Sequence, residues 1–372
     1  MAFTLSELRS AVQRTAEPQA WSTRAAALAD ERQRIEQFVD SGGQAYGFTT
    51  LFGHLDAIKR EREAIANLYQ GHLVGHPKRL DPKIARGIVV VKLCQLSNGG
   101  TGISPSSYER LREGYASGLD NVRVDLSASY GSGDVVPGAW LVNSIFGEAG
   151  DLHRGDLMAL INGAYVPAGV LLGSLNQLEI VASRALSLTA EARKVSKKLQ
   201  KAVDVQLPVS LRDLAPLYEA VDHTREQLET TLLRAANRRS GNPMFQIDND
   251  AVRPLSNSSF LDFQLTFALE AAQESALVIA AYVTSATRWV CGLAEETADE
   301  LQRPLFVQLP KVAKAYEGKL LSRSGGTGYS QNESRGVEDI SDSSLRRVLD
   351  LVESASVIDN ISDLLEEALR MV

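Results

Sequence analysis

Two long stretches almost free of helix breakers constrain the fold of this 372-residue chain more than any other feature. The first runs from about 165 to 204, and the second, from about 261 to 293, carries very few polar residues. A helix that is apolar on nearly every face is buried in a core instead of lying on a surface. We therefore predict a mostly α fold, in which a long helix bundle supplies the core.

Breakers and caps divide the remainder of the chain. We expect an N-terminal helical region with a loop at Tyr46 and a turn at Gly131-Ser132-Gly133 (1–150), a central helix bundle (151–317), and a flexible loop followed by a C-terminal helix (318–372). The Gly-, Ser- and Arg-rich part of that loop spans 318–337, and Asn242-Pro243 opens another loop that leads to Phe260. Further helices are expected in two parts of 1–40, at about 54–72, 82–97, from Pro105, from Gly138, at about 214–239 and at about 344–370.

Composition excludes several classes of function. The formal net charge is −7 and no basic run is long, which argues against nucleic acid as a partner. The histidines and the two cysteines lack metal-ligand spacing, and the Gly-rich stretch after Ser97 lacks the lysine of a nucleotide phosphate loop, so we expect no metal and no nucleotide. Two distant thiols without a signal peptide indicate a cytoplasmic setting. No uninterrupted apolar run is long enough to predict a membrane span.

The stretch Ala128–Pro137 has a sequence that allows an unusual reaction of the backbone. Glycines flank Ser132 on both sides, which removes side-chain hindrance and opens strained dihedrals. Such a turn lets the amide nitrogen of Gly133 attack the carbonyl carbon of Gly131, and loss of water closes a five-membered ring. Loss of a second water from Ser132 leaves methylidene-imidazolone (MIO), an electrophile made from the chain itself. The alternative interpretation is an ordinary Gly-Ser loop.

Two other residues also have two interpretations each. Tyr46 lies in a glycine-containing loop, where it is either an ordinary loop aromatic or a phenol placed to act as a base. Asn162 follows an apolar run and precedes a glycine, which is typical of a helix C-cap, although a site residue fits as well.

Taken together, these stretches resemble the histidine and aromatic amino acid ammonia-lyase family, which also contains aminomutases. The chain looks like a shortened and diverged member. The segments that carry the resemblance follow the family's order along the chain: Tyr46-Gly47 with Phe52-Gly53, Gly131-Ser132-Gly133-Asp134 with Pro137, Leu160-Ile161-Asn162-Gly163, Gln206 with Ser210-Leu211-Arg212, Asn242-Pro243, Phe260, and Val337-Glu338-Asp339.

The resemblance implies a homotetramer whose active sites combine loops of three subunits, acting on a small amino-acid-like substrate. Tyr46 would be the base at the β-carbon, and Glu338 a second acid or base. Ser132 would become the MIO methylene that takes the substrate amine. The remaining roles concern binding: Arg212 would hold the substrate carboxylate, Asn162 and Gln206 would support the prosthetic group and the amine, and Phe260 would line the site.

The chain departs from the family pattern in four places. Gly131 stands where the family has alanine, and Val209 stands where it has a second essential tyrosine. The pair facing the substrate side chain is Leu96-Ser97, without histidine, so we expect histidine and tyrosine to be poor substrates. The segment between Asn162 and Gln206 and the part after Glu338 are both short compared with the family.

Three hypotheses follow. The first is a lyase or aminomutase that uses MIO on a non-histidine α-amino acid. The second is an MIO-free enzyme that uses Tyr46 and Glu338 for acid–base elimination, isomerisation or cyclisation, as Val209 and Gly131 suggest. The third is a non-catalytic scaffold, against which the dispersed set of site residues argues.

Overall fold

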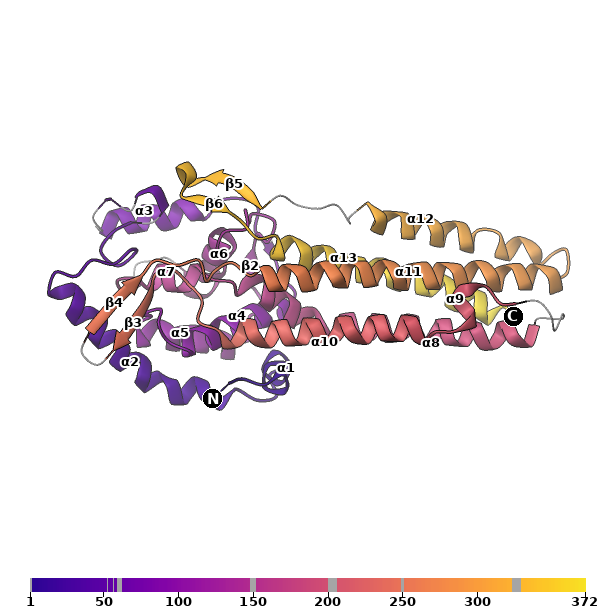
Figure 1. The fold of residues 1–372 in the computed structure, drawn as a ribbon, viewed down its shortest axis with the longest axis horizontal. Helices are drawn as coiled ribbons and strands as arrows, with labels where there is room; N and C mark the ends of the chain where they lie inside the picture. The colour runs from indigo at the N-terminus through magenta and orange to yellow at the C-terminus, as the bar shows by residue number, and fades with distance from the viewer. Residues whose placement is uncertain are drawn as a thin grey trace. The chain divides into compact units, whose positions relative to one another are not determined.

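The computed structural model describes residues 2–51, 53–55, 57–58, 62–147, 152–199, 206–248, 251–322 and 329–372. The described chain is mostly helical, as the sequence predicts, and its strands form three two-stranded antiparallel sheets (Figure 1). It forms two compact units. Unit 1 consists of Met1–Ser174, Glu229–Thr266 and Thr327–Arg346, and unit 2 of Leu175–Leu228, Phe267–Gly326 and Arg347–Val372. The division of the chain into three successive segments stays a prediction.

Unit 1 contains most of the short elements. Its helices are α1 (Leu5–Gln13), α2 (Gln19–Asp40), α3 (Arg62–His72), α4 (Pro82–Ser97), α5 (Pro105–Ser117), α6 (Val135–Phe146) and α7 (Asp156–Ile161), with 3₁₀ turns at Gly53–Leu55 and Ser334–Gly336. Its strands are β1 (Lys78–Arg79), β2 (Arg123–Val124), β3 (Met244–Asp248), β4 (Ala251–Leu255), β5 (Ser330–Glu333) and β6 (Glu338–Ile340).

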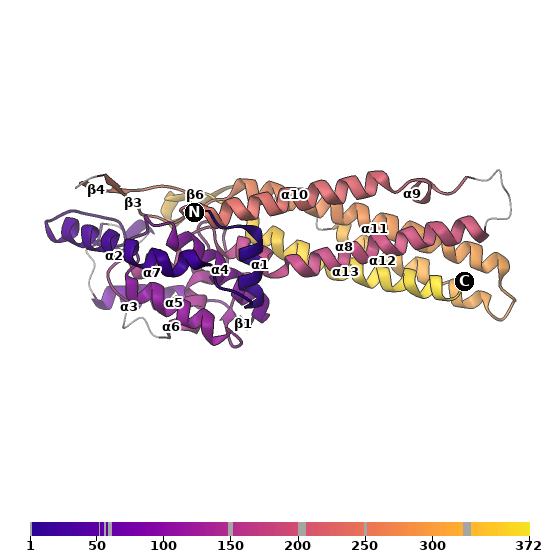
Figure 2. The same cartoon turned by 90° about the horizontal axis from the view of Figure 1, so that it is seen from below.

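Unit 2 contains α9 (Val209–Arg212), the 3₁₀ turn Arg303–Phe306 and α12 (Leu309–Leu321). Its long helices lie side by side as a bundle in both views (Figures 1 and 2). Four of the five boundaries between the two units fall inside the four longest helices, which are α8 (Val166–Leu199), α10 (Ala215–Asn237), α11 (Phe263–Thr297) and α13 (Ser344–Arg370). The fifth lies between Gly326 and Thr327.

Local signals explain why several helices begin where the sequence predicts. Asp81 caps α4 by accepting a hydrogen bond from the Lys83 amide at 2.7 Å, and Pro82 follows at the first helical position. Asp342 accepts from the Ser344 amide at 3.0 Å, which confirms the cap expected before α13. The break near Pro18 is confirmed as well, because α2 begins at Gln19.

Two predicted loops contain strands instead. The segment after Asn242-Pro243 forms the hairpin β3–β4, and residues 330–340 form β5–β6, although we expected flexible chain there. Residues 323–328 of that predicted loop lie outside the described residues. The helix expected at about 54–72 is described as a 3₁₀ turn and α3, while Phe52 of the resembling segment lies outside the described residues.

Unit 1 is held together around α4. Gly87 lies so close to Gly169 of α8 that a Cβ at position 87 would overlap the carbonyl oxygen of Gly169. In another part of unit 1, Phe48 packs edge to face on Phe245 of β3, with the ring centroids 4.8 Å apart. That aromatic pair joins the loop carrying Tyr46 to the β3–β4 hairpin.

Two helical stretches are long and apolar enough to cross a membrane by length and composition alone: Asp156–Lys198 and Phe263–Thr297. The most apolar window of the first is entirely buried in the protein, and that of the second is half buried. Core helices of a bundle have the same properties.

Candidate active site

Ser132 lies in a turn with left-handed backbone angles, directly before a helix. Gly131 and Gly133 on either side have φ values of +81° and +77°, and Asp134 is left-handed too, at +48°. Glycine adopts such angles without steric cost. We expected the following helix to begin at Gly138, but α6 begins at Val135, with Asp134 as its N-cap. The positive end of the helix therefore abuts the turn.

Hydrogen bonds from several parts of the chain fix the turn. The carbonyl of Gly131 accepts from the Asp342 amide at 2.8 Å, and that of Gly133 accepts from the Gly163 amide at 3.3 Å. The Gly131 amide donates to the hydroxyl of Ser129 at 3.0 Å, and this hydroxyl donates to the carboxylate of Asp134. The turn is thus held at both of its glycine carbonyls, and the Ser132 side chain is buried.

The space around the two glycines is filled. A Cβ at position 131 would overlap the carbonyl oxygen of Asp342, and a Cβ at position 133 would lie 2.7 Å from Nδ2 of Asn162. The alanine that the family carries in place of Gly131 therefore does not fit this turn. Phe260 lies on the same side as Asn162, with its ring 3.6 Å from the Cβ position of residue 133.

Asn162 is the C-cap of α7, as one interpretation predicted, and it also faces the turn. Its Oδ1 is buried and has no hydrogen-bond partner among the described residues. A buried unpaired acceptor costs about 1–3 kcal/mol, so such an atom usually has a partner. A ring closed at Gly131–Gly133 carries only hydrogen-bond acceptors, so its partner here is the Asn162 Nδ2 that faces Gly133, while Oδ1 stays unpaired. The turn fits such a ring, because ring closure uses only the backbone of residue 131.

Lys92, which the sequence analysis missed, lies directly behind Asn162. Its Nζ donates to the Asn162 carbonyl at 2.9 Å and lies 4.3 Å from the ring centroid of Tyr165. The side chain is 1% exposed, and this burial lowers the lysine pKa to about 7. A single lysine inside the apolar run of residues 88–96 was the signal that could have revealed it.

A second group of polar side chains combines the loops around Tyr46 and β6. The Tyr46 hydroxyl accepts a hydrogen bond from the Gly53 amide at 2.7 Å. Tyr130 is hydrogen-bonded to Glu338, and Ser334 donates to Oε2 of Glu338 at 2.7 Å. Burial raises the pKa of Tyr130, and the nearby Glu338 carboxylate and Tyr46 raise it further. Tyr46 and Glu338 thus lie in one neighbourhood, which Tyr130 bridges.

Two buried carboxyl groups lie beside the turn. Burial, together with the charge of Asp342, raises the Asp134 pKa to about 7, although the hydrogen bond from Ser129 opposes the shift. Burial also raises the Asp342 pKa, against the hydrogen bonds that its carboxyl accepts from Ser344 and the Asp262 amide. A carboxyl that titrates near neutral pH can transfer protons, which makes Asp134 a further residue of interest.

Leu96 and Ser97, expected to face the substrate side chain, end α4 and are both buried. The Ser97 hydroxyl donates to the carbonyl of Cys94 in its own helix at 2.8 Å. Its hydroxyl is therefore satisfied locally, and the pair presents a predominantly apolar surface.

The other three predicted site residues belong to unit 2. Gln206 and Arg212 are exposed, and Val209 is 71% exposed. The Arg212 Nε donates to the carbonyl of Leu207 at 2.7 Å, so the last residue of α9 is bonded to the chain just before this short helix. Within one chain the described structure therefore groups Tyr46, the turn, Asn162, Phe260 and Glu338 in unit 1, while these three lie in unit 2.

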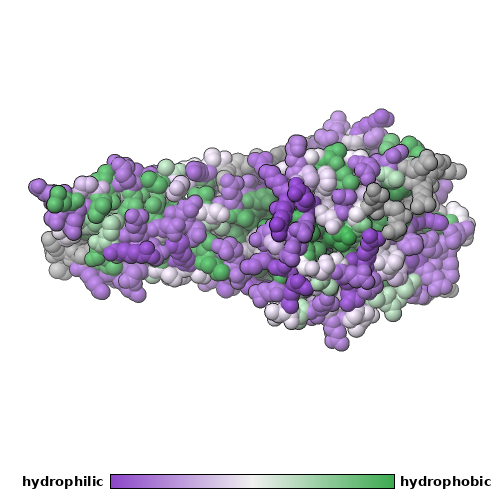
Figure 3. All heavy atoms as spheres, turned by 180° about the vertical axis from the view of Figure 1, so that it is seen from behind, coloured by the Kyte–Doolittle hydropathy of each residue, from purple (hydrophilic) through white to green (hydrophobic). Residues whose placement is uncertain are grey.

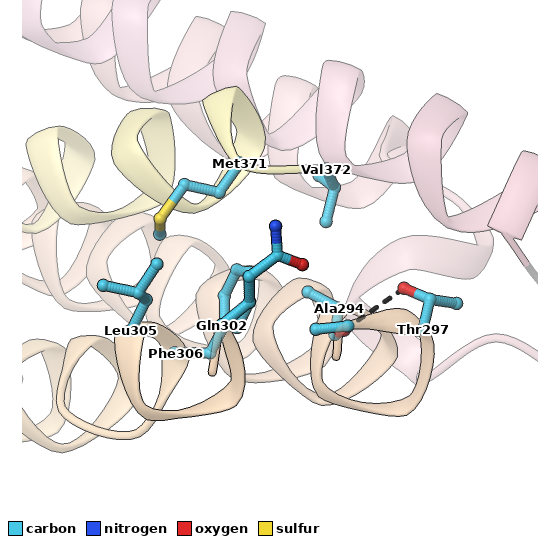
Figure 4. Close-up of a pocket in the computed structure, with 8 residues that line it drawn as sticks. Ala294, Thr297, Gln302, Leu305, Phe306, Met371 and Val372 are labelled. Carbon is cyan, nitrogen blue, oxygen red and sulfur yellow. Dashed lines mark hydrogen bonds between the residues drawn. The ribbon is translucent and has the colours of Figure 1, made fainter. Parts of the chain in front are cut away.

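The predicted catalytic residues do not line either of two cavities. One, of about 310 Å³, lies in unit 2, where the Gln302 amide points between Met371 and Val372 (Figure 4). The other, of about 620 Å³, lies in unit 1 beside the β3–β4 hairpin. Among the described residues no three His, Cys, Asp or Glu side chains are grouped as metal ligands.

Comparison with known proteins finds relatives in sequence and in fold. The sequence profile named aromatic amino acid lyase matches residues 3–172. Histidine ammonia-lyase from Alkaliphilus metalliredigens is 25% identical over 208 residues, which are 53% of this chain and 40% of that enzyme. A probable histidine ammonia-lyase from Thermoplasma volcanium is 25% identical over 292 residues, 62% of this chain and 59% of the relative. The matches thus span about half the length of these relatives.

Solved structures share the fold along the entire chain. Tyrosine aminomutase from Streptomyces globisporus superposes with a TM-score of 0.78 at 17% identity, covering 99% of this chain and 86% of that one. Phenylalanine aminomutase from Pantoea agglomerans gives a TM-score of 0.73 at 14% identity, covering 99% and 88%. With the matched profile and the turn at Ser132, these likenesses lead to one conclusion: residues 3–172 resemble the aromatic amino acid lyase family in sequence, and nearly the whole chain shares the fold of solved ammonia-lyases and aminomutases.

Proposed function

We propose that this protein is an ammonia-lyase or aminomutase that acts on a non-histidine α-amino acid through MIO formed from Gly131-Ser132-Gly133. The observation that carries the proposal is the turn at Ser132, whose two glycines have positive φ and whose neighbour Asn162 turns its Nδ2 donor towards Gly133. When formed, MIO supplies an electrophile for the substrate amine. Asn162 and Phe260 are the residues that would hold it, because both lie against Gly133.

Removal of a proton from the β-carbon requires a positioned base, since that proton is weakly acidic. We assign this role to Tyr46. The Gly53 amide, 2.7 Å from its hydroxyl, stabilises negative charge on the oxygen when the proton leaves. Glu338 is assigned as the second acid or base, and the bonds from Tyr130 and Ser334 orient its carboxylate.

The substrate class follows from the side chains expected to face it. Leu96 and Ser97 offer no charged or imidazole partner, and the Ser97 hydroxyl is already bonded to its own helix. A histidine side chain would lose its hydrogen bonds to water in such surroundings without gaining replacements, which opposes its binding. We therefore favour an amino acid with an apolar side chain.

We assign Arg212 to the substrate carboxylate, with Gln206 and Val209 beside it, in the site of a neighbouring subunit. All three are exposed in the single chain, as residues that face another copy must be before assembly. Apolar side chains of unit 2 are exposed too, including Phe267 at 56% and Ile180 at 51%, and Figure 3 shows such patches along its surface. A homotetramer in the cytoplasm, without metal or nucleotide, completes the proposal.

The test is the intact mass of the purified protein with peptide mapping across residues 124–145, followed by assays with a panel of α-amino acids. We expect a deficit of two water molecules in the peptide that contains Ser132, and release or migration of the amino group of one substrate. The variant Ser132→Ala should lose the deficit and the activity. The matched control Ser127→Ala, which lies outside the ring-forming triad, should keep the deficit.

A second candidate, acid–base elimination or isomerisation without MIO, is supported by the hydrogen bond between Tyr130 and Glu338. It predicts a wild-type protein of unmodified mass, activity that survives Ser132→Ala, and loss of activity in Tyr46→Phe. An unmodified mass would therefore refute the first proposal and direct the substrate search to this one. If no amino acid or related compound is turned over, a non-catalytic scaffold remains.

A further inference from the structure

The Gly131 carbonyl, which ring closure would attack, has a hydrogen-bond donor from a distant part of the chain. The backbone amide of Asp342 donates to this oxygen at 2.8 Å. From this geometry we infer that the Asp342 amide activates the Gly131 carbonyl for ring closure, so that Asp342 is a positioning residue of MIO formation. The inference rests on the proposed function, since it concerns the same turn.

The chemistry of ring closure identifies this oxygen as the one that must be stabilised. The Gly133 nitrogen forms a bond to the Gly131 carbonyl carbon and loses its proton, and the electron pair of the C=O bond moves onto the oxygen. That oxygen then leaves as water, taking up the proton lost by Gly133 and the proton of the Ser132 nitrogen, which leaves a C=N bond. A second water departs with the Ser132 hydroxyl and its α-proton, so the chain loses two waters in all without any oxidant.

The position of the donor suits this step. A fixed N–H at about 2.7–3.1 Å from a developing oxyanion stabilises the transition state in acyl chemistry, because the dipole requires no reorganisation. The Asp342 amide already contacts this oxygen in the ground state, at 2.8 Å, before attack begins. The same N–H makes the carbonyl carbon more electrophilic before attack.

The Asp342 side chain holds its own backbone amide in place. Its carboxyl accepts from the Asp262 amide at 2.7 Å, from the Ser344 amide at 3.0 Å and from the Ser344 hydroxyl at 2.5 Å. Asp262 in turn pairs with Arg234, and its Oδ2 lies 3.5 Å from Nη1 of Arg238. The donor is therefore fixed by the loop that precedes α11 and by the start of α13.

This arrangement gives a reason for the glycine at position 131. A Cβ there would overlap the Asp342 carbonyl oxygen, so alanine would push the 341–342 backbone away from the turn. Such a displacement would also remove the amide from the Gly131 oxygen. Glycine at position 131 thus leaves the space in which the Asp342 backbone approaches and donates its hydrogen bond.

The decisive experiment replaces Asp342 by its α-hydroxy acid analogue in cell-free translation, which exchanges the N–H for an ester oxygen and keeps the side chain. We follow the loss of two waters by mass spectrometry from the moment of synthesis. Loss of one oxyanion donor should slow ring closure about 100- to 1,000-fold. The same exchange at Ser343, the next residue, is the control and should leave the rate unchanged.

Side-chain variants give an independent readout. Asp342→Ala removes the three anchoring bonds and should also slow the loss of water, whereas Ser343→Ala removes a hydroxyl that has no partner among the described residues and should not. Circular dichroism checks that each protein folds. If the wild-type protein loses two waters and the Asp342 ester analogue loses them at the same rate, this inference alone is overturned. A wild-type protein of unmodified mass overturns the proposed function and this inference together.

Discussion

The two units differ in where they keep their charged groups. Unit 1 buries several of them, since Lys92, Asp134 and Asp156 are each less than 8% exposed, whereas among the described residues of unit 2 Arg347 is the one buried charged side chain. In unit 2, Arg184 on α8 forms ion pairs with three carboxylates of α13, of which the best shielded, Glu366, is still 31% exposed. Buried charges cost free energy unless they are fully bonded, whereas exposed pairs contribute little. The buried charges of unit 1, which contains most of the candidate site residues, therefore cost stability. The exposed ion pairs of unit 2 change its stability little.

The largest expected effect is on activity. Tyr46→Phe should lower the turnover number by about 10²–10⁴-fold for the substrate that the amino-acid panel reveals, because it removes the proposed base. Far-UV circular dichroism and the two-water deficit should be unchanged. Tyr218→Phe, on α10 in unit 2, is the matched control and should keep full activity. Equal activity in both variants would contradict the assignment of Tyr46.

The next largest effect is on stability. Asp156 is fully buried and accepts from the Ser104 amide at 2.8 Å, from the hydroxyls of Ser104 and Ser107 and from the His153 amide. Asp156→Ala should lower the free energy of unfolding by about 3–5 kcal/mol, because these four donors lose their acceptor and Arg32 loses one of its two carboxylate neighbours. Urea unfolding measures the loss. If Asp156→Ala lowers the free energy of unfolding by less than Arg184→Ala in unit 2, which is described last, the contrast between the units is reversed.

The pH dependence of stability should have two opposite branches. Burial lowers the Lys92 pKa from 10.5 to about 7, so between these values only the unfolded chain binds the proton, and stability rises with pH. Burial raises the Asp134 pKa from 3.8 to about 7, so between these values only the folded chain binds the proton, and stability falls as pH rises.

Each branch contributes at most about 1.4 kcal/mol per pH unit, which urea unfolding between pH 4.5 and 9.5 would resolve. Lys92→Met should remove the rise above neutral pH, and Asp134→Asn should remove the fall below it. Should the variants keep the wild-type slopes, other groups must carry the pH dependence and the two side chains would titrate normally.

The smallest effect belongs to unit 2. Arg184→Ala breaks the pairs with Asp359, Asp363 and Glu366, and the loss of stability should be small because all three pairs are exposed to water. The loss should shrink in high salt, where exposed charges are screened. A large, salt-independent loss would show that unit 2 depends on its charges as unit 1 does.

Much of the fold followed from local sequence signals. The bounds of α4 match the prediction, because Asp81-Pro82 opens the helix and Asn98-Gly99 ends it. The bundle helices α8 and α11 were expected from their length and lack of breakers. The two hairpins were missed, because their strands are short and the register of each depends on its partner. Pro254 in β4 also argued against a strand.

The members of the candidate site were proposed from the sequence, but their connections were not. The sequence alone indicated the turn at Ser132, since a turn depends on consecutive residues, and the chemistry expected of its two flanking glycines stays a prediction. Only the tertiary structure brought the Asp342 amide to Gly131, Lys92 to Asn162, and Glu338 to Tyr130. Periodicity, caps and turn residues act over a few positions along the chain, whereas these contacts depend on how distant loops pack, which no local pattern records.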